Sequence, residues 1–416
     1  MESEKNYNRT KVAFYFDRSV LAKVYAPAVI EFLDANFEVF FICGPKPNDS
    51  WTDNIGYRPL EKNIKIPFID RVKFIYFNEF EEVERIFTEE KITDLFITHA
   101  IDEELETLIK KIKKNGLKIS CIQWAADYLV ITPDKLKLID NLFVHSAEMR
   151  EIYFKHFPEA FKKNLSSKFI PVGNPIFDCL KENQTKDYLL KKYGIPEGKK
   201  VVLLMALNLS VLPWAKYYFG SPNKVKLFLN FLIKPNIGYL KDYLKFGGYK
   251  ASLQSVKKWC QKNDALLIVK SRPKHKEPKY VKEIADLVIS DDSFCPLASV
   301  ELVSISDLVI GYGSTVVLEA GFLGVRALSI DIDIKSKISW RRTLDAYRES
   351  GIYGYEGLSD TIDYHKVSEY LDEHDLNSLK VDRVKRKEYI EKFLGYDDFN
   401  SGKRIVDYVA GNQAKQ

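Results

Sequence analysis

The chain has 416 residues, 46% of them apolar and 13% aromatic, so it is long enough for two domains and too apolar to be disordered. Its 63 Lys and Arg residues nearly balance 58 Asp and Glu residues, and the net charge of +5 does not predict nucleic-acid binding. No apolar run approaches the ~20 residues that span a bilayer, and residues 1–11 lack the apolar segment of a signal peptide.

The cysteines are widely spaced and form no Cys-x-x-Cys or Cys/His cluster. They are Cys43, Cys121, Cys179, Cys260 and Cys295. Three of them lie in or beside apolar runs, where a buried, reduced thiol is the usual state. We therefore expect reduced cysteines, no structural zinc and a cytoplasmic location, with any membrane lipid reached from the membrane surface.

The first half of the chain alternates short apolar strands with helical patterns. Strands are expected at residues 11–16, 37–43, 72–76, 94–98, 118–123 and 141–145, and a strand with a turn at 169–178. Helices are expected at 25–35, 79–90, 102–114 and 147–156. Because the strands are almost entirely apolar, they predict a parallel sheet covered by helices on both faces.

A second series of the same kind follows a polar linker at residues 181–200, which contains a short helical pattern at 185–193. Strands are expected at 200–206 and 265–270, and helices at 253–262, 367–372, 383–393 and 402–410. The pattern breaks between residues 207 and 248, which we interpret as an insertion. This insertion either contacts substrate or membrane or lies against its own domain.

Residues 306–330 read as strand, tight loop, helix and strand. Two glycines precede Ser314 and Thr315, and a helical pattern starts directly after them. Free N–H groups at a helix N terminus favour an anion, so the N–H groups of Gly313 to Thr315 and the two hydroxyls are candidate phosphate donors. Glu319, about one turn later, is a candidate acceptor for ribose hydroxyls. Alternatively, Ser314 is only a helix cap and Glu319 a solvated helix residue.

A basic loop follows the strand at 265–270, at the strand end where open α/β sheets bind ligands. Lys270, Arg272, Lys274 and His275 are its candidate diphosphate-binding residues. A solvated basic loop is the alternative. His145 and His156 are assigned to surface or packing positions.

Three segments of the second half resemble one family. Residues 267–275 are similar to its strand ending in Lys-x-His-Pro or Arg-Pro-His-Pro, although here the histidine follows Pro273 and Lys274. Residues 306–324 resemble its S-D-L-V-I-x-x-x-S-(S/T)-V-x-x-E-A-x-x-x-G run, and residues 393–409 its terminal D-G-K-x-x-x-R-I helix. The family is the GT-B glycosyltransferases, in particular the bacterial surface-polysaccharide group of CDP-glycerol glycerophosphotransferases and capsule Kdo transferases.

The resemblance implies an α/β fold of two Rossmann-like parallel-sheet domains that face a cleft. We expect an acceptor domain at residues 11–178, a nucleotide-donor domain at 185–396 with the insertion at about 207–248, and a helix at 397–412 that packs on the first domain. An inverting transferase needs a base from the acceptor domain. Asp17, His99 and Asp127 follow strands of that domain and are the candidates.

The implied function is transfer of a sugar from a nucleotide-activated donor to a surface polysaccharide or glycolipid, from the cytoplasm or the inner face of the cell membrane. The expected partners are the nucleotide-activated sugar, a carbohydrate or lipid-linked acceptor and the membrane surface, without nucleic acid. No cofactor or metal is expected, since no Asp-x-Asp occurs in these segments. Alternatives are a polyol-phosphate transferase, an enzyme like UDP-N-acetylglucosamine 2-epimerase, whose fuller signature is not visible, and a non-catalytic binding subunit of an assembly complex.

Overall fold

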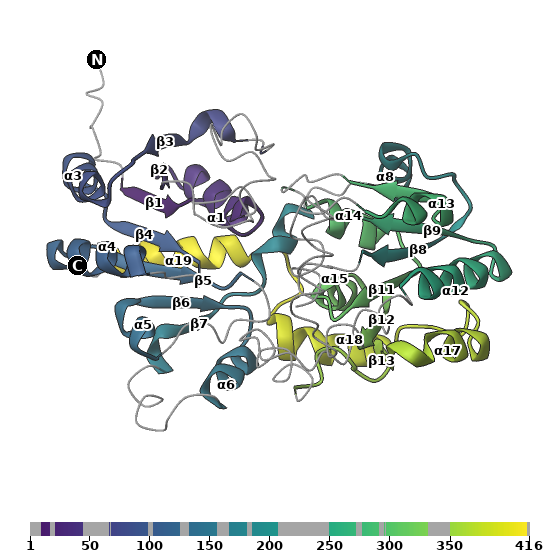
Figure 1. Ribbon diagram of the computed structural model, residues 1–416. Coiled ribbons are helices and arrows are strands. Elements are labelled where there is room, and N and C mark those ends of the chain that lie inside the picture. The colour runs from purple at the N-terminus through teal and green to yellow at the C-terminus, as the bar shows by residue number, and fades with distance from the viewer. Residues whose placement is uncertain are drawn as a thin grey trace, which may run out of the picture. The chain divides into compact units, whose positions relative to one another are not determined.

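The computed structural model describes residues 10–16, 21–44, 66, 68–98, 103–124, 133–155, 166–180, 185–206, 249–271, 277–290, 295, 297–331 and 350–413. The insertion expected at about 207–248 therefore lies outside the described residues. The chain forms two compact units (Figure 1). Unit 1 comprises Met1–Asn183, Asp292–Ala298 and Glu388–Gln416, and unit 2 comprises Gln184–Asp291 and Ser299–Lys387.

Unit 1 contains a seven-stranded sheet in the order β3-β2-β1-β4-β5-β6-β7, and every pair in it is parallel. Its strands are β1 (Lys11–Tyr15), β2 (Glu38–Cys43), β3 (Lys73–Tyr76), β4 (Asp94–Ile97), β5 (Lys118–Ile122), β6 (Asn141–Val144) and β7 (Phe169–Pro171). Its α-helices are α1 (Ala22–Asp34), α3 (Phe80–Glu90), α4 (Glu103–Ile112), α5 (Pro133–Leu138), α6 (Ala147–Lys155) and α19 (Ser401–Gln413). The parallel sheet that the apolar strands predicted is confirmed.

Phenylalanine side chains fill the core of unit 1 where α1 and α19 cover the sheet. Phe14 of β1 stacks on Phe96 of β4 with ring centroids 4.7 Å apart, and Phe16 stacks on Phe41 of β2 at the same distance. All four residues are fully buried. Burying an aromatic side chain contributes roughly 1.5–3 kcal/mol, so this cluster fixes the middle of the sheet.

The last helix, α19, packs on α1 in unit 1. Gly402 permits the close approach, because a Cβ atom there would lie 2.6 Å from the Pro27 carbonyl oxygen of α1. Asp178, in the 3₁₀-helix η5 (Pro175–Leu180), accepts the Gly402 N–H at 2.7 Å and so caps α19. Arg404 donates to the Val172 carbonyl oxygen after β7. The chain end thus returns to the first unit.

Unit 2 contains a six-stranded parallel sheet in the order β10-β9-β8-β11-β12-β13. Its strands are β8 (Lys200–Met205), β9 (Ala265–Lys270), β10 (Leu287–Ile289), β11 (Leu308–Tyr312), β12 (Arg326–Asp331) and β13 (Ser359–Asp363). Its helices are α8 (Lys186–Tyr193), α12 (Tyr249–Lys262), α13 (Lys279–Ile284), α14 (Ala298–Ser304), α15 (Val316–Leu323), α17 (Val367–Glu373) and α18 (Arg383–Tyr389). Ala298 and residues 388–389 are counted with unit 1.

Two cysteines depart from the expected reduced state. Cys179 of η5 forms a disulfide with Cys295, and their Cα atoms are 5.6 Å apart. Cys43, Cys121 and Cys260 are buried and form no disulfide, as expected. The prediction was wrong for the bonded pair because the two residues are 116 positions apart, and only the return of residues 292–298 to unit 1 brings them together. Within the described residues, no helix is both long and apolar enough to cross a membrane.

Candidate functional site

The loop between β11 and α15 in unit 2 has the form that the sequence predicted. β11 is a buried strand between β8 and β12, and it ends at Tyr312. Gly313 has a φ of +50°, a conformation that strains residues with a side chain. A Cβ atom on Gly311 would lie 3.0 Å from Ser314 Cβ and Val316 Cγ1. These two glycines let the chain turn tightly from the strand into the helix.

Some backbone N–H groups of this loop already donate hydrogen bonds within the protein, and others do not. The Gly313 N–H donates to the Ile330 carbonyl oxygen at 3.1 Å, so this donor is already engaged within the sheet, and a role for Gly313 in phosphate binding stays a prediction. Val316 N–H points to Ser314 Oγ at 3.4 Å, which is long for a hydrogen bond. The N–H groups of Ser314 and Thr315 make no hydrogen bond within the described part of the chain. They are the two backbone donors that remain for an anion.

Helix α15 begins with partly covered polar residues and is anchored at its C-terminal end. Ser314 is buried beside the helix start, and Glu319 lies in the first turn. Glu319 is half-buried, with one carboxylate oxygen fully covered, so it is not a freely solvated helix residue. At the other end Gly324 is left-handed, and the Arg386 guanidinium donates to the Phe322 carbonyl oxygen at 3.1 Å. This cation complements the negative end of the helix dipole.

Lys270 lies at the carboxyl end of β9 and is only 5% exposed. Its ammonium donates to the carbonyl oxygen of Ser271 at 2.8 Å, a bond that partly offsets the cost of burying a charge. The basic residues after it, Arg272, Lys274 and His275, lie outside the described residues. Whether the four converge on one ligand therefore stays a prediction.

A tyrosine cluster supports the β11 end of the site. The Tyr312 ring packs edge-on against Tyr249 at 5.6 Å, and its hydroxyl lies 3.2 Å from Ser252 Oγ. Tyr364 lies beside Tyr312, and burial raises the pKa of Tyr364 to about 12. Burial also raises the pKa of Tyr312. Both phenols are neutral at physiological pH, so this cluster is a rigid support and not an acid or base.

The candidate bases of unit 1, Asp17, His99 and Asp127, all lie outside the described residues. Another histidine of unit 1, His145, lies among the described residues. His145 follows β6, is 1% exposed, and has no hydrogen-bond partner for either ring nitrogen among the described residues. Its backbone N–H donates to Gln123 Oε1 at 2.9 Å. Burial lowers the pKa of His145 to about 3, so the ring is neutral and too weakly basic to act as a general base near pH 7.

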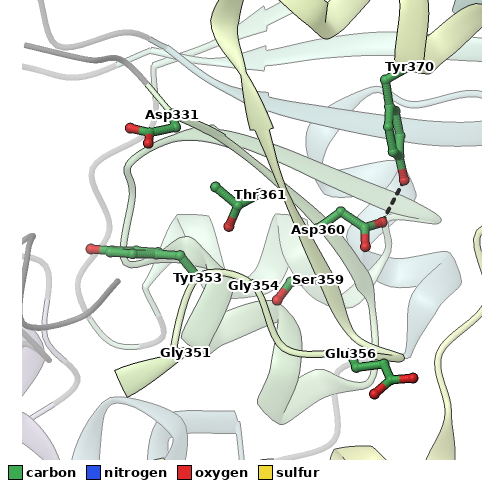
Figure 2. Close-up of a pocket in the computed structure, with 9 residues that line it drawn as sticks. All are labelled: Asp331, Gly351, Tyr353, Gly354, Glu356, Ser359, Asp360, Thr361 and Tyr370. Carbon is green, nitrogen blue, oxygen red and sulfur yellow. Dashed lines mark hydrogen bonds between the residues drawn. The ribbon is translucent and has the colours of Figure 1, made fainter. Parts of the chain in front are cut away.

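Sequence reasoning missed a second feature of unit 2, a cavity of about 720 Å³ beside the edge strand β13. Figure 2 shows side chains from β12, β13, α17 and the loop before β13 around it. The signal in the sequence was the run of Gly and Tyr at residues 351–355, shortly before a strand of mostly polar residues at 359–363.

The whole chain is similar to several solved structures, although no family model and no curated protein sequence matches it. A variant of the wall teichoic acid polymerase TagF has a TM-score of 0.59 at 13% identity, covering 98% of this chain and 90% of that chain. UDP-N-acetylglucosamine 2-epimerase from Neisseria meningitidis, bound to UDP-N-acetylglucosamine, has a TM-score of 0.54 at 14% identity, covering 97% and 100%. A complex of S. aureus MnaA with UDP has a TM-score of 0.57 at 14% identity, covering 97% of both chains.

The fold is of the GT-B type. At these identities the likeness establishes the GT-B fold and no reaction. Open α/β sheets bind ligands outside the carboxyl ends of their strands, and the loop between β11 and α15 lies at such an end. Of the predicted nucleotide-binding residues that the structure describes, Lys270 ends β9 and Gly313 to Thr315 follow β11, so they lie at that end of the second sheet, and Glu319 lies one turn into α15.

Proposed function

We propose that this protein is a GT-B glycosyltransferase that moves a sugar from a nucleotide-activated donor to a polysaccharide or glycolipid acceptor. The observation that carries the proposal is the loop at Gly311–Thr315, where two backbone N–H groups stay unused among the described residues, with Glu319 one turn later. The solved structures with UDP or UDP-N-acetylglucosamine bound share the fold and support a nucleotide-sugar ligand.

In this reaction the acceptor hydroxyl oxygen forms a bond to the anomeric carbon of the donor sugar. The bond from that carbon to the phosphate oxygen breaks, and its electron pair leaves with the nucleoside phosphate. The hydroxyl proton passes to a base of the acceptor domain, for which Asp17, His99 and Asp127 remain the candidates.

Negative charge develops on the leaving phosphate in the transition state. Hydrogen-bond donors that are fixed in place stabilise this charge and so lower the activation free energy. We assign this role to the N–H and hydroxyl groups of Ser314 and Thr315, together with Lys270 and with Arg272, Lys274 or His275. Turnover should then persist in EDTA. Arg272→Ala should lower kcat more than it raises KM, by about 10²-fold or more.

Two other reactions remain as candidates because enzymes of those kinds share the fold. A wall teichoic acid polymerase and a UDP-N-acetylglucosamine 2-epimerase match this chain about equally well. The protein would then transfer a polyol phosphate or isomerise the donor. A non-catalytic nucleotide-sugar-binding subunit is the fourth possibility.

Mass spectrometry of reaction products separates these candidates. The protein is incubated with CMP-, CDP-, UDP- and GDP-activated donors and a lipid-linked oligosaccharide extract, with and without EDTA. A glycosyl mass added to the acceptor supports the proposal, whereas a polyol phosphate added, or an isomerised donor, supports the alternatives. Nucleotide binding without any product indicates a binding subunit, and turnover that Mg²⁺ alone restores refutes the metal-free mechanism.

A location in the cytoplasm, at the inner face of the membrane, belongs to the same proposal. The Cys179–Cys295 disulfide argues against it, because disulfides are rare in reducing compartments. Peptide mapping of the protein isolated with its thiols blocked would show whether the bond exists in the cell.

A further inference from the structure

The cavity beside β13 is separate from the loop at Gly311–Thr315 and is built within unit 2. β13 is the edge strand of its sheet, so no further strand among the described residues covers its outer side. Asp331 at the end of β12, Tyr353 and Glu356 of the preceding loop, and Tyr370 of α17 surround Asp360 and Thr361 of this strand (Figure 2).

The chemistry of its wall disfavours a phosphate ligand. Among the described residues no Lys, Arg or His lines the cavity, whereas Asp331, Glu356 and Asp360 do. A phosphate group would be repelled by Glu356, which has no cationic partner in the described part of the chain, whereas Arg326 offsets the charge of Asp360. In the described part of the protein, no three Asp, Glu, His or Cys side chains gather in a way that could hold a metal ion. The ligand must therefore supply hydrogen-bond donors without carrying negative charge.

The carboxylate of Asp360 is fixed in place by its contacts, and a neighbouring cation neutralises its charge. Oδ2 of Asp360 accepts the Tyr370 hydroxyl at 2.5 Å and pairs with the Arg326 guanidinium. The Tyr370 ring stacks on His374 at 4.1 Å, which fixes its direction. Asp360 Oδ1 takes no hydrogen bond within the described residues. Because Arg326 balances the charge, this oxygen suits a neutral hydroxyl better than a second cation.

Two more groups offer hydrogen bonds to the cavity. The Thr361 side chain is exposed there, and Glu356 is exposed on the loop; neither forms a hydrogen bond or ion pair in the described part of the chain. Gly354 lets this loop approach the strand, since a Cβ atom there would lie 2.7 Å from Thr361 Oγ1. Tyr353 also lines the cavity but is only 5% exposed, so the groups that a ligand can reach there are mainly polar.

We propose that this cavity binds an uncharged hexose or N-acetylhexosamine unit, with its hydroxyls donated to Asp360 Oδ1 and Glu356 and hydrogen-bonded to Thr361. The identification of this sugar as part of the acceptor rests on the proposed function. The cavity itself is a second ligand site of unit 2. Its acidic wall favours a neutral sugar over a phosphate group.

Saturation-transfer NMR on the full chain tests the proposal with glucose, galactose and N-acetylglucosamine, with glucose 6-phosphate, and with putrescine as a cationic probe. At least one uncharged sugar should bind. Thr361→Val, which keeps the shape and removes the hydroxyl, should weaken that binding by about 3- to 10-fold, and Glu356→Gln by a smaller factor. Glu373→Gln, an exposed residue of α17 outside the cavity, is the matched control and should change nothing.

The proposal is overturned if none of the three uncharged sugars binds, or if they bind equally well to the Thr361 and Glu356 variants. Tighter binding of glucose 6-phosphate or of putrescine at the same residues also overturns it. A UDP and CDP titration on the same samples separates this result from the proposed function. Nucleotide binding without sugar binding refutes only the sugar site, whereas sugar binding without nucleotide binding refutes only the nucleotide-dependent reaction.

Discussion

Asp178→Asn is expected to stabilise the protein above pH 6. Asp178 is a buried carboxyl group, and this burial raises its pKa from 3.8 to about 6 despite its hydrogen bonds to Ser401 and Gly402. Because the folded pKa exceeds the unfolded one, its contribution to stability is complete below about pH 4 and is lost as the pH rises through 6. Ionisation at pH 7.5 then costs up to about 3 kcal/mol. Asn removes the charge and can still accept the Gly402 N–H.

The gain in stability of about 3 kcal/mol is an upper limit for Asp178→Asn. Oδ1 of Asp178 is buried without a hydrogen-bond partner among the described residues, and the amide of Asn would place an unpaired donor there. We expect urea denaturation to show a gain of about 1–3 kcal/mol at pH 7.5 and none at pH 4. Asp382→Asn, at the exposed cap of α18, is the matched control. Equal effects of Asp178→Asn at both pH values, or a loss at pH 7.5, would refute the reasoning.

Three further predictions concern stability. His145 has a folded pKa of about 3, below the unfolded value of 6.5, so its contribution to folding stability is complete above pH 6.5. The free energy of unfolding should therefore fall by about 2 kcal/mol between pH 7 and 5. Urea titrations of His145→Asn should show a smaller fall over this range. Reduction of the Cys179–Cys295 bond should lower the free energy of unfolding by about 2–5 kcal/mol, and a Cys179→Ser variant should then no longer respond to dithiothreitol. Gly402→Ala should push α19 away from Pro27, and so lower the free energy of unfolding by about 1–3 kcal/mol and the melting temperature with it. An unchanged melting temperature would show that the two helices can move apart at no cost.

Much of the fold could be predicted because its strands are buried on both faces. The strands Lys11–Tyr15 and Ala265–Lys270 need no long-range information, since a continuous apolar run between helical patterns is enough. The strand predicted at 265–270 has the observed bounds. The tight loop at Gly311 and Gly313 was also visible, since few other residues fit its geometry.

Other elements gave no comparable signal. β13 was missed because its residues Ser359, Asp360 and Thr361 are polar, as an edge strand permits, and β10 is only three residues long. The Cys179–Cys295 bond depends on residues 292–298 joining unit 1, which no local pattern encodes.

The candidate site was predictable only as a set of residue types. The sequence made Ser314, Thr315 and Glu319 candidates, and their role stays a prediction. Which N–H groups are already used depends on the neighbouring strand, since the Gly313 N–H is bonded to Ile330 of β12. The sugar cavity depends on side chains from four elements, and single sequences do not show such convergence.

The central claim is that the loop from Gly311 to Glu319 holds a nucleotide, and isothermal titration tests it most directly. UDP, CDP, GDP and CMP are titrated into the wild type, Glu319→Gln and the control Glu373→Gln. At least one nucleotide should bind, and Glu319→Gln should weaken its binding by about 5-fold, since glutamine still accepts a hydrogen bond but loses the extra ~1 kcal/mol of a charged acceptor. Equal affinity of the wild type and Glu319→Gln, or no binding of any of the four nucleotides, would contradict it.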